Sequence, residues 1–405
     1  MFFVDKPYVS EFVKETLLEN ALPVVATTVA KSLGLKDGTR FLAEDEAVEQ
    51  ARQGRVPLLY ATSENCIGWI AEHLSFTGIP AKIELFKNKL KFREMTRPFF
   101  PEFYFREVLI EDLATVRFDD LPVPFIIKPA VGFFSMGVHK VASREEWTAA
   151  VAAIRSEIDR TRGLYPEEVL DSRAFIVEEC IDGEEFAVDA YFDAAGAPVV
   201  LGIFQHVFAS GYDVSDRVYI TSKAIIEENL AAFSELLGQI GKVAGVRNFP
   251  VHAELRRTAA GRVVPIEVNP MRFGGWCTTA DLTFRAYGLN PYLCYFSRQR
   301  PDWPRLLEGK AGKLFAIVVL DNGSGIEAKH IRSFDYDMLL ARFEKPLELR
   351  KVDYHEYPVF GFLFTETAAD NFAELEWILR SDLRPFIKTG PTDAHSNLKG
   401  NEEPT

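Results

Sequence analysis

Cysteine is scarce in this sequence of 405 residues, and the few that occur are arranged neither as metal ligands nor as bridges. The four cysteines, Cys66, Cys180, Cys277 and Cys294, show no CxxC or other metal-binding spacing, and each lies in apolar surroundings. This pattern excludes a disulfide framework and a cysteine zinc site as the basis of the fold. We therefore expect buried thiols and a cytoplasmic protein.

Long apolar runs and an excess of positive charge are also missing. No segment approaches the ~18 consecutive apolar residues of a membrane helix, and Asp5 and Lys6 interrupt the N-terminus too early for a secretory signal. The net charge of −13 argues against a general nucleic-acid binder or a protein held on anionic lipid. A nucleotide site needs only a few local cations, so we expect small-molecule partners, no nucleic acid and no membrane.

The first segment, to about Leu85, lacks the glycine fingerprints GxGxxG and GxxxxGK[ST] of two common nucleotide-binding folds. It contains instead apolar runs at 22–30 and 56–63 and helical spacing over 64–74. This alternation predicts a small α/β unit with a mainly parallel sheet. The length of the whole chain indicates two to four subdomains, and any nucleotide must be held in another way.

The stretch 251–275 has the pattern of a β-hairpin with an apolar face and a polar face. If it folds symmetrically about its loop, residues whose numbers sum to about 521 lie opposite each other. Glu254 then faces Glu267, with His252 and Asn269 on the same side. Two facing carboxylates repel, but a magnesium ion between them, also bound by the amide oxygen, would stabilise the pair. The alternative is a solvated hairpin face with two surface acids.

Two further segments carry cations. Residues 84–97 are locally basic, with Lys89 among five Lys and Arg residues, which is also typical of a solvated helix face. Lys128 ends a short apolar strand and is followed by a loop that holds Gly132, Ser135 and Gly137 and then by a second strand. Backbone amides in a glycine loop beside a lysine can bind phosphate.

Acidic residues crowd one predicted turn. The segment 174–193 is typical of a hairpin that turns at Asp182-Gly183, with four acids nearby: Glu178, Glu179, Glu184 and Glu185. These acids are either an ordinary exposed corner or acceptors for the hydroxyl groups of a ribose.

Taken in order, these features resemble the ATP-grasp superfamily, carboxylate-amine ligase type, from about Lys89 to Trp276. The resemblance implies an α/β (α+β) fold with a Rossmann-like N-terminal domain over 1–88 and an ATP-grasp domain over 89–300. Within the latter it implies a lid subdomain over about 115–180 and a metal-binding core over about 181–300. A β-rich C-terminal subdomain would follow over 301–388, and the tail 389–405 has no apolar pattern and is expected to be disordered.

The resemblance also assigns the residues that hold ATP. Lys89 and Lys128 match the two lysines that bind the nucleotide phosphates, with Lys91 as the alternative to Lys89. The segment from Gly132 to Gly137 matches the lid loop, and Ser135 matches a phosphate donor within it.

The adenosine end of ATP would lie at the acid-rich turn. Glu178 starts the hinge, the carbonyl of Glu179 and the amide of Ile181 face the adenine, and Glu185 binds the ribose hydroxyls. The magnesium ligands would be Glu254, Glu267 and Asn269, with manganese as a substitute ion.

The family arginine is displaced in this sequence. Many members run Asn-Pro-Arg into a glycine pair, whereas here Met271 stands between Pro270 and Arg272. The resemblance nevertheless implies that Arg272 stabilises the transferring phosphoryl group. His252 and the amides of Gly274 and Gly275 would hold an oxyanion beside it. Arg256 and Arg285 either bind a substrate carboxylate or are ion-paired surface residues.

The reaction that the resemblance implies is an ATP-dependent ligation. A small carboxylate, for example an amino acid, is phosphorylated to an acylphosphate, and an amine then attacks it to form an amide. The alternatives are a kinase or phosphotransferase that stops at phosphate transfer, and a nucleotide-binding regulatory protein without ligase activity. A homodimer is common among such chains.

Overall fold

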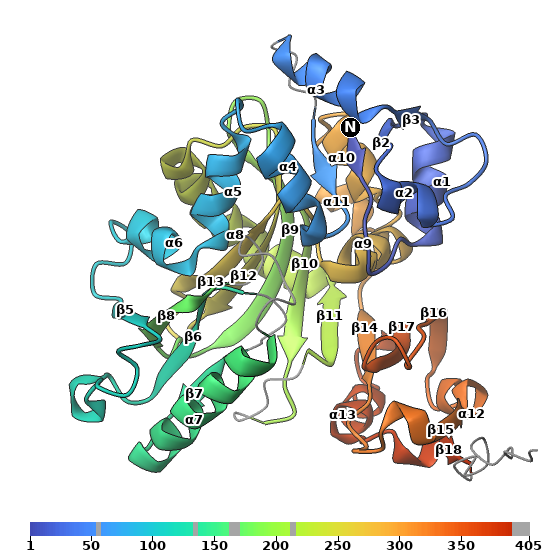
Figure 1. Ribbon diagram of the computed structural model, residues 1–405. Coiled ribbons are helices and arrows are strands. Elements are labelled where there is room, and N and C mark those ends of the chain that lie inside the picture. Colours follow the sequence, from blue (N-terminus) through green and yellow to red (C-terminus); the bar gives the residue numbers. More distant parts are fainter. Residues whose placement is uncertain (54–57, 133–136, 162–170, 211–215, 391–405) are drawn as a thin grey trace, which may run out of the picture. The chain divides into compact units, whose positions relative to one another are not determined.

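The computed structural model describes residues 1–53, 58–132, 137–161, 171–210 and 216–390 (Figure 1). The chain forms two compact units. The first comprises Met1–Gln205 and Lys223–Gly309, and the second comprises His206–Ser222 and Lys310–Thr405. The expected domain limits, finer than these two units, remain predictions.

The first unit begins with a four-stranded parallel sheet in the order β3-β2-β1-β4, which confirms the expected α/β start. Its strands are β1 (Phe2–Phe3), β2 (Val24–Val25), β3 (Phe41–Leu42) and β4 (Tyr60–Ala61). The helices around it are α1 (Glu11–Glu19), α2 (Thr28–Ser32), α3 (Glu44–Arg52) and, after the 3-10 turn η1 (Glu64–Cys66), α4 (Ile67–His73).

The basic segment forms the end of one helix and the whole of the next. Helix α5 (Ile79–Lys87) stops at Asn88, and α6 (Lys89–Thr96) starts there. The side chain of Asn88 accepts hydrogen bonds from the backbone N–H groups of Leu90 and Lys91, at 3.0 and 3.1 Å. This cap satisfies amides that a helix start leaves unpaired, and it turns Lys89 into the first residue of a new helix.

A second sheet of the first unit is antiparallel, in the order β5-β8-β6-β7. Its strands are β5 (Phe105–Leu109), β6 (Phe125–Val131), β7 (His139–Val141) and β8 (Asp171–Glu179). Helix α7 (Arg144–Thr161) contributes Trp147 and Ile154 to the buried core of this part. The expected pairing of the strands around the glycine loop is confirmed as β6 with β7, but Lys128 lies in the middle of β6 and not at its end.

The acid-rich turn is not a hairpin, and that prediction is wrong. Strand β8 pairs with β5 and β6, whereas β9 (Glu184–Phe192) pairs with β12 in another sheet. The chain passes between the two sheets at Gly183, which has φ +119° and would clash with the carbonyl oxygen of Arg257 if it carried a Cβ. Alternation along two strands predicts the strands, but it does not identify their partners.

The core sheet of the first unit contains β13-β12-β9-β10. Its remaining strands are β10 (Pro198–Val207), β12 (Phe249–Arg257) and β13 (Val263–Pro270). Helices α5 and α8 (Lys223–Ala244) both pack against β13 (Figure 1). The chain then continues through η3 (Gly275–Cys277) into α9 (Thr278–Tyr287), α10 (Pro291–Phe296) and α11 (Trp303–Leu306).

The second unit is rich in β-structure, as expected. Four antiparallel strands follow the order β11-β14-β17-β16, and β15 pairs with β18. The strands are β11 (Val218–Ser222), β14 (Lys313–Asp321), β15 (Ile331–Phe334), β16 (Lys345–Lys351), β17 (Val359–Ala368) and β18 (Ile387–Thr389). The helices are α12 (Tyr336–Leu340) and α13 (Ala373–Arg380). From residue 391 onward the expected disordered tail lies outside the described residues.

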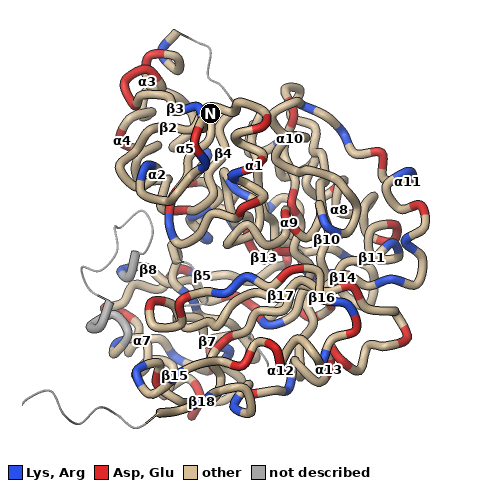
Figure 2. The backbone as a smooth tube through the Cα atoms, turned by 90° about the vertical axis from the view of Figure 1, so that its right-hand side faces the viewer, with Lys and Arg blue, Asp and Glu red and all other residues tan. Residues whose placement is uncertain are grey.

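Charged residues of both signs are distributed along the chain, and Figure 2 shows the acidic start of α3, which contains Glu44, Asp45 and Glu46. Among the described residues, no helix combines the length and the apolar character needed to cross a bilayer.

Candidate active site

The hairpin of β12 and β13 has the expected register over the half that adjoins Pro270. Glu254 lies opposite Glu267, and His252 lies opposite Asn269. Strand β9 pairs with the other edge of β12, so that Asp189 lies beside His252. Residues paired across strands share a face. The face therefore carries a row of Asp189, His252 and Asn269 next to the row that contains both glutamates.

A β-bulge ends this register. Between Glu254 and Leu255 the pairing shifts, and Leu255 lies opposite Pro265. The extra residue moves Val264 opposite Arg256, so the expected two-faced alternation is wrong beyond the bulge. Bulges leave backbone groups outside the ladder, and here the carbonyl groups of Pro265 and Ile266 accept hydrogen bonds from one arginine.

That arginine is Arg93 of α6, which the sequence placed only within a basic segment. Its Nη1 donates to the Pro265 carbonyl at 2.6 Å, and its Nη2 donates to the Ile266 carbonyl at 3.2 Å. Its Nε donates to Glu178 Oε2 at 2.8 Å. The rigid fork of a guanidinium suits three partners at once. Arg93 therefore ties the bulge of the hairpin to the end of β8.

Glu178 is the buried anion between two cations. Its Oε1 lies 2.5 Å from Lys128 Nζ, and its side chain is 3% exposed. Burial alone would raise the pKa of Glu178, but Arg93 and Lys128 outweigh burial and lower this pKa to about 2. Glu178 is therefore ionised and holds Lys128 in place.

Lys89 pairs with the second glutamate of the hairpin. Its Nζ lies 3.1 Å from Glu267 Oε2, while Asn269 Nδ2 donates to Glu267 Oε1 at 3.2 Å. Burial opposes ionisation of Glu267, but the positive charges of Lys89 and Lys128 lower its pKa well below the usual range. Lys91, the alternative to Lys89, points elsewhere: its side chain is 50% exposed and pairs with Glu84.

The hairpin face fits a magnesium ion by the chemistry of its donors. Glu254 and Glu267 face each other, and the amide of Asn269 turns its nitrogen to Glu267, which leaves its oxygen as the group that would bind a cation. Among the described residues, no three His, Cys, Asp or Glu side chains are grouped to enclose a metal. An ion here would need further oxygen ligands from water or phosphate, as magnesium usually does.

Met271 is accommodated in a turn directly after β13. The residue has φ 69° and is buried, and its carbonyl accepts a hydrogen bond of 2.8 Å from the N–H of Ala61 in β4. The residue that the resemblance treats as inserted thus adopts a left-handed conformation. The side chain of the next residue, Arg272, contacts Glu64 of η1.

Arg272 is anchored by Glu64. Its Nε and Nη2 donate to Glu64 Oε1 at 3.0 and 2.6 Å, and Lys87 pairs with the other oxygen of Glu64. Burial disfavours the charged guanidinium, but the carboxylates of Glu64, Glu254 and Glu267 raise the pKa of Arg272. Arg272 thus lies in the field of both hairpin glutamates, although Glu64 holds it.

Asp189 is a site residue that sequence reasoning missed. Its carboxylate contacts His252 Nδ1 at 2.7 Å, the N–H of Gly274 at 3.0 Å and the hydroxyl of Thr279 at 2.5 Å. The N–H of Gly274 is therefore directed to Asp189, and not to the place where an oxyanion was expected. The signal in the sequence was a single acid within the apolar strand Phe186–Phe192.

The predicted adenosine residues lie along the passage from β8 to β9. The carboxylate of Glu179 accepts from the N–H of Tyr104 at 3.2 Å. Arg256 donates to Glu185 Oε2 through Nε and Nη2, at 3.0 and 2.8 Å, and to the carbonyl of Ile181 at 2.5 Å. Arg256 is thus ion-paired, as one of the two interpretations held.

The glycine loop is described only at its ends. Gly132 follows β6, and Gly137 has φ 69°. Ser135 lies outside the described residues, and so does most of the expected lid loop.

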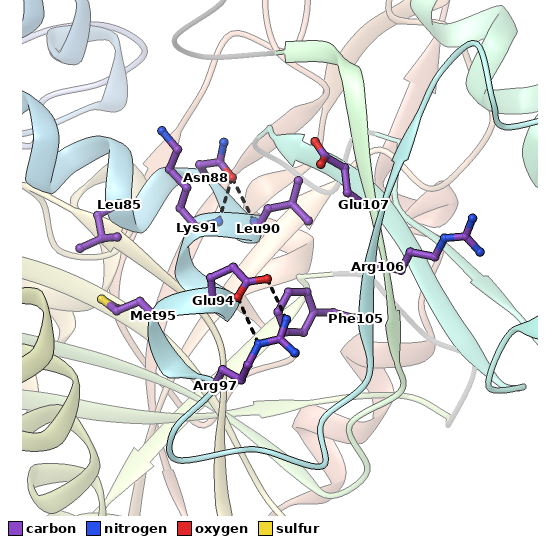
Figure 3. Close-up of a pocket in the computed structure, with 10 residues that line it drawn as sticks. All are labelled: Leu85, Asn88, Leu90, Lys91, Glu94, Met95, Arg97, Phe105, Arg106 and Glu107. Atoms are coloured by element: carbon purple, nitrogen blue, oxygen red, sulfur yellow. Dashed lines mark hydrogen bonds and ion pairs between the residues drawn. The ribbon is translucent and has the colours of Figure 1, made fainter.

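A cavity of about 580 Å³ lies beside α6 (Figure 3). The ion-paired residues Lys89, Arg93 and Glu178 are not among those that line it. Its walls come from α6 and β5 and include Lys91, Glu94, Arg97, Phe105 and Arg106. Lys89 and Arg93 occupy the inner face of the same helix, so this cavity and the candidate site lie on opposite sides of α6.

Two sequence comparisons bear on the family. The family model described as an ATP-grasp domain matches residues 121–280, a range that contains Lys128, Glu178, Glu254, Glu267 and Asn269. No curated protein sequence matches the chain.

Solved structures share the fold over nearly the whole chain. The L-amino acid ligase from Bacillus licheniformis is 20% identical with a TM-score of 0.67, covering 96% of this chain and 97% of that chain. The carboxyaminoimidazole ribonucleotide synthase from Aspergillus clavatus, complexed with ATP, is 14% identical with a TM-score of 0.60, covering 95% and 98%. The biotin carboxylase from Campylobacter jejuni is 12% identical with a TM-score of 0.58, covering 91% and 87%. At these identities the likeness concerns the fold.

Proposed function

We propose that this chain, in which residues 121–280 are an ATP-grasp domain, is an ATP-dependent ligase that joins a small carboxylate to an amine. The observation that carries the proposal is the pairing of Glu254 with Glu267 on β12 and β13, with Lys89 held against Glu267 and Lys128 close enough to shift its pKa. Two facing acids beside two lysines are arranged to hold a metal and a polyphosphate together.

ATP and magnesium would be bound by distinct parts of this site. Glu254, Glu267 and the oxygen of Asn269 would hold the metal, with manganese as a substitute. Lys89 and Lys128 would bind the phosphates. The hinge residues Glu178, Glu179 and Ile181 would hold the adenine, and Glu185 the ribose, while Gly132, Ser135 and Gly137 belong to the loop that would cover the phosphates.

Phosphoryl transfer is assisted chiefly by positioning and by neutralising charge. When bound, ATP supplies the phosphoryl group that activates the carboxylate as an acylphosphate. Arg272, together with the amide of Gly275, would stabilise the negative charge that develops on the transferred group or at the acyl carbon. The buried anchor Glu64 keeps this guanidinium in one orientation.

The proposed substrates are small metabolites, with an amino acid as the carboxylate. The fold shared with the L-amino acid ligase from Bacillus licheniformis supports this choice. The second candidate is a kinase or phosphotransferase that stops after phosphate transfer. It is favoured only if ADP is released without an amine and a stable phosphorylated product accumulates.

A screen for phosphate release tests the proposal. Purified protein with ATP and magnesium would be given pairs of amino-acid carboxylates and amines, and amide products would be identified by mass spectrometry. We expect phosphate release that needs both substrates and that is lost in Glu267→Gln. Glu184→Gln, which removes an exposed partner of Arg257, is the matched control and should retain activity. Turnover in Glu267→Gln equal to that of the control would contradict the metal assignment.

A further inference from the structure

In the buried pair of Asp189 and His252, the surrounding hydrogen bonds determine which group donates and which accepts. Asp189 is fully buried on β9. Three groups approach its carboxylate, namely His252 Nδ1, the N–H of Gly274 and the hydroxyl of Thr279. The N–H of Gly274 can only donate. It is shared between Asp189 at 3.0 Å and Thr279 Oγ1 at 2.9 Å.

This sharing determines the direction of each remaining bond. Because Thr279 Oγ1 already accepts from Gly274, its own hydrogen is available to Asp189 Oδ2, 2.5 Å away. A carboxylate oxygen without a hydrogen can only accept, so Asp189 Oδ1, which accepts from the N–H of Gly274, also accepts from His252 Nδ1. A neutral imidazole that donates from Nδ1 carries a lone pair on Nε2.

We propose that Asp189 is a positioning residue that holds His252 Nε2 as a hydrogen-bond acceptor for the incoming amine. The inference rests on the proposed ligase function. His252 lies in the row next to Glu254 and Glu267, on the same face. Nε2 therefore belongs to the side of the sheet on which the acylphosphate would form. An N–H of the amine donated to Nε2 orients the amine lone pair toward the acyl carbon.

The inference changes the role of His252. The family resemblance placed this side chain among the donors to an oxyanion, but in the neutral tautomer that donates from Nδ1 to Asp189, Nε2 has no hydrogen to donate. The oxyanion would then depend on Arg272 and the amide of Gly275, while His252 serves the second half of the reaction.

The geometry around Gly274 supports a dedicated network. A Cβ at Gly274 would collide with Thr279 Oγ1, so only glycine allows the backbone to approach both acceptors. Asp189 thereby connects β9, β12 and the turn before α9. The same carboxylate that orients His252 also sets the backbone two residues after Arg272.

The test separates the two half-reactions. ADP release reports carboxylate activation, and amide yield reports capture by the amine. His252→Asn keeps a donor amide that can reach Asp189 but removes the Nε2 acceptor. We expect ADP release to persist while amide formed per ADP falls about tenfold, the factor that corresponds to losing one hydrogen bond of about 1.4 kcal/mol. The KM for the amine should rise, and the KM for ATP should stay unchanged.

Two variants at Asp189 complete the test. Asp189→Asn can keep its oxygen toward His252 and Gly274 and turn its nitrogen to Thr279, so we expect the coupling of ADP release to amide formation to be largely retained. Asp189→Leu offers no acceptor to His252 Nδ1, so ADP release should no longer be coupled to amide formation. Thr279→Val controls for loss of the hydroxyl. In this variant Asp189 still accepts from His252 Nδ1, so the coupling should be retained.

The outcomes are distinguishable. If the wild-type protein forms no amide with any substrate pair, the proposed function fails. If the wild type ligates and His252→Asn still couples ADP release to amide formation as the wild type does, only this inference is overturned. If Asp189→Leu fails to fold, the amount of amide formed per ADP in His252→Asn alone decides whether the inference holds.

Discussion

At the scale of single residues, Glu178 is the point where three elements of the first unit meet. It lies next to the last residue of β8, accepts from Arg93 of α6 and pairs with Lys128 of β6. A buried carboxylate between two cations is tolerable only while both partners are present, because each charge was removed from water. Glu178 therefore has a structural role in addition to its place at the proposed hinge.

Glu178→Gln should destabilise the protein strongly. The change leaves two buried cations without their carboxylate, and we expect the free energy of unfolding to fall by about 3 kcal/mol or more. Urea denaturation followed by tryptophan fluorescence measures this fall. The control, Glu184→Gln, removes an exposed pair with Arg257 and should change stability by less than about 1 kcal/mol. Equal effects of the two changes would contradict the role given to Glu178.

Stability should depend on pH through the same residue. The pKa of Glu178 is about 2 in the folded protein, below its ordinary value of 4.5, and Glu64 is lowered to about 2 as well, by Arg272 and Lys87 against the effect of burial. A lowered folded pKa adds stability that is complete above pH 4.5 and is lost as the pH falls toward 2. Urea midpoints measured from pH 5 to pH 2 should therefore decline, and the decline should be shallower in Glu178→Gln. A parallel decline in both proteins would exclude Glu178 as its source.

The sequence predicted which charged residues of the β12–β13 hairpin face each other, but it did not predict the ion-pair partners that come from distant parts of the chain. The alternation of β12 and β13 predicted the facing pair of Glu254 and Glu267 because both acids lie in one local hairpin. Glu64 and Asp189 were not found, since their partners Arg272 and His252 are 208 and 63 residues away along the chain. Periodicity carries no information about contacts at that separation.

At the scale of elements, the bulge and helix α6 depend on each other. Arg93 donates to the carbonyl groups of Pro265 and Ile266 beside the bulge, and Lys89 lies one helical turn earlier on the same face. The basic segment therefore combines inward-facing cations with solvated ones. The sequence alone showed that the segment is basic, but it did not show which of its cations face inward and which face solvent.

Arg93→Lys tests this dependence. A lysine retains the charge for Glu178 but has no fork, so both bulge carbonyls lose their donors, and we expect a loss of about 2–4 kcal/mol in the free energy of unfolding. On the same helix, Arg97 is half exposed and pairs with Glu94, so Arg97→Lys should stay within about 0.5 kcal/mol of the wild type. Denaturant titration of both variants makes the comparison. Unchanged stability in Arg93→Lys would show that the bulge needs no capping.

The strand content of the acid-rich segment was predictable, but its connection was not. Two strands joined by Asp182-Gly183 read locally as a hairpin. In the structure each strand finds a partner from a different part of the chain, because β5 and β6 pair with β8 while β12 pairs with β9. Long-range pairing outweighed the local turn signal here.

At the scale of the whole molecule, binding should stabilise the fold in a way that requires both metal and nucleotide. With MgATP at about 100 times its dissociation constant, linkage adds about 2.7 kcal/mol. Thermal denaturation with ATP alone, magnesium alone and both together measures the effect. We expect the large shift in melting temperature only with both, and its loss in Glu254→Gln and Glu267→Gln but not in Glu184→Gln. An equal shift from ATP alone would contradict a metal-bridged site.

The ion pairs of the site have a consequence for selectivity. Lys89, Lys128 and Arg272 are each neutralised by a carboxylate of the same chain, so an entering anion competes with anions that are already in place. A lone phosphate offers too little charge to displace them. If Glu267 holds a metal as proposed, its present partner Lys89 would become available to a polyphosphate. We therefore expect the site to bind metal and polyphosphate together and to bind either one alone only weakly.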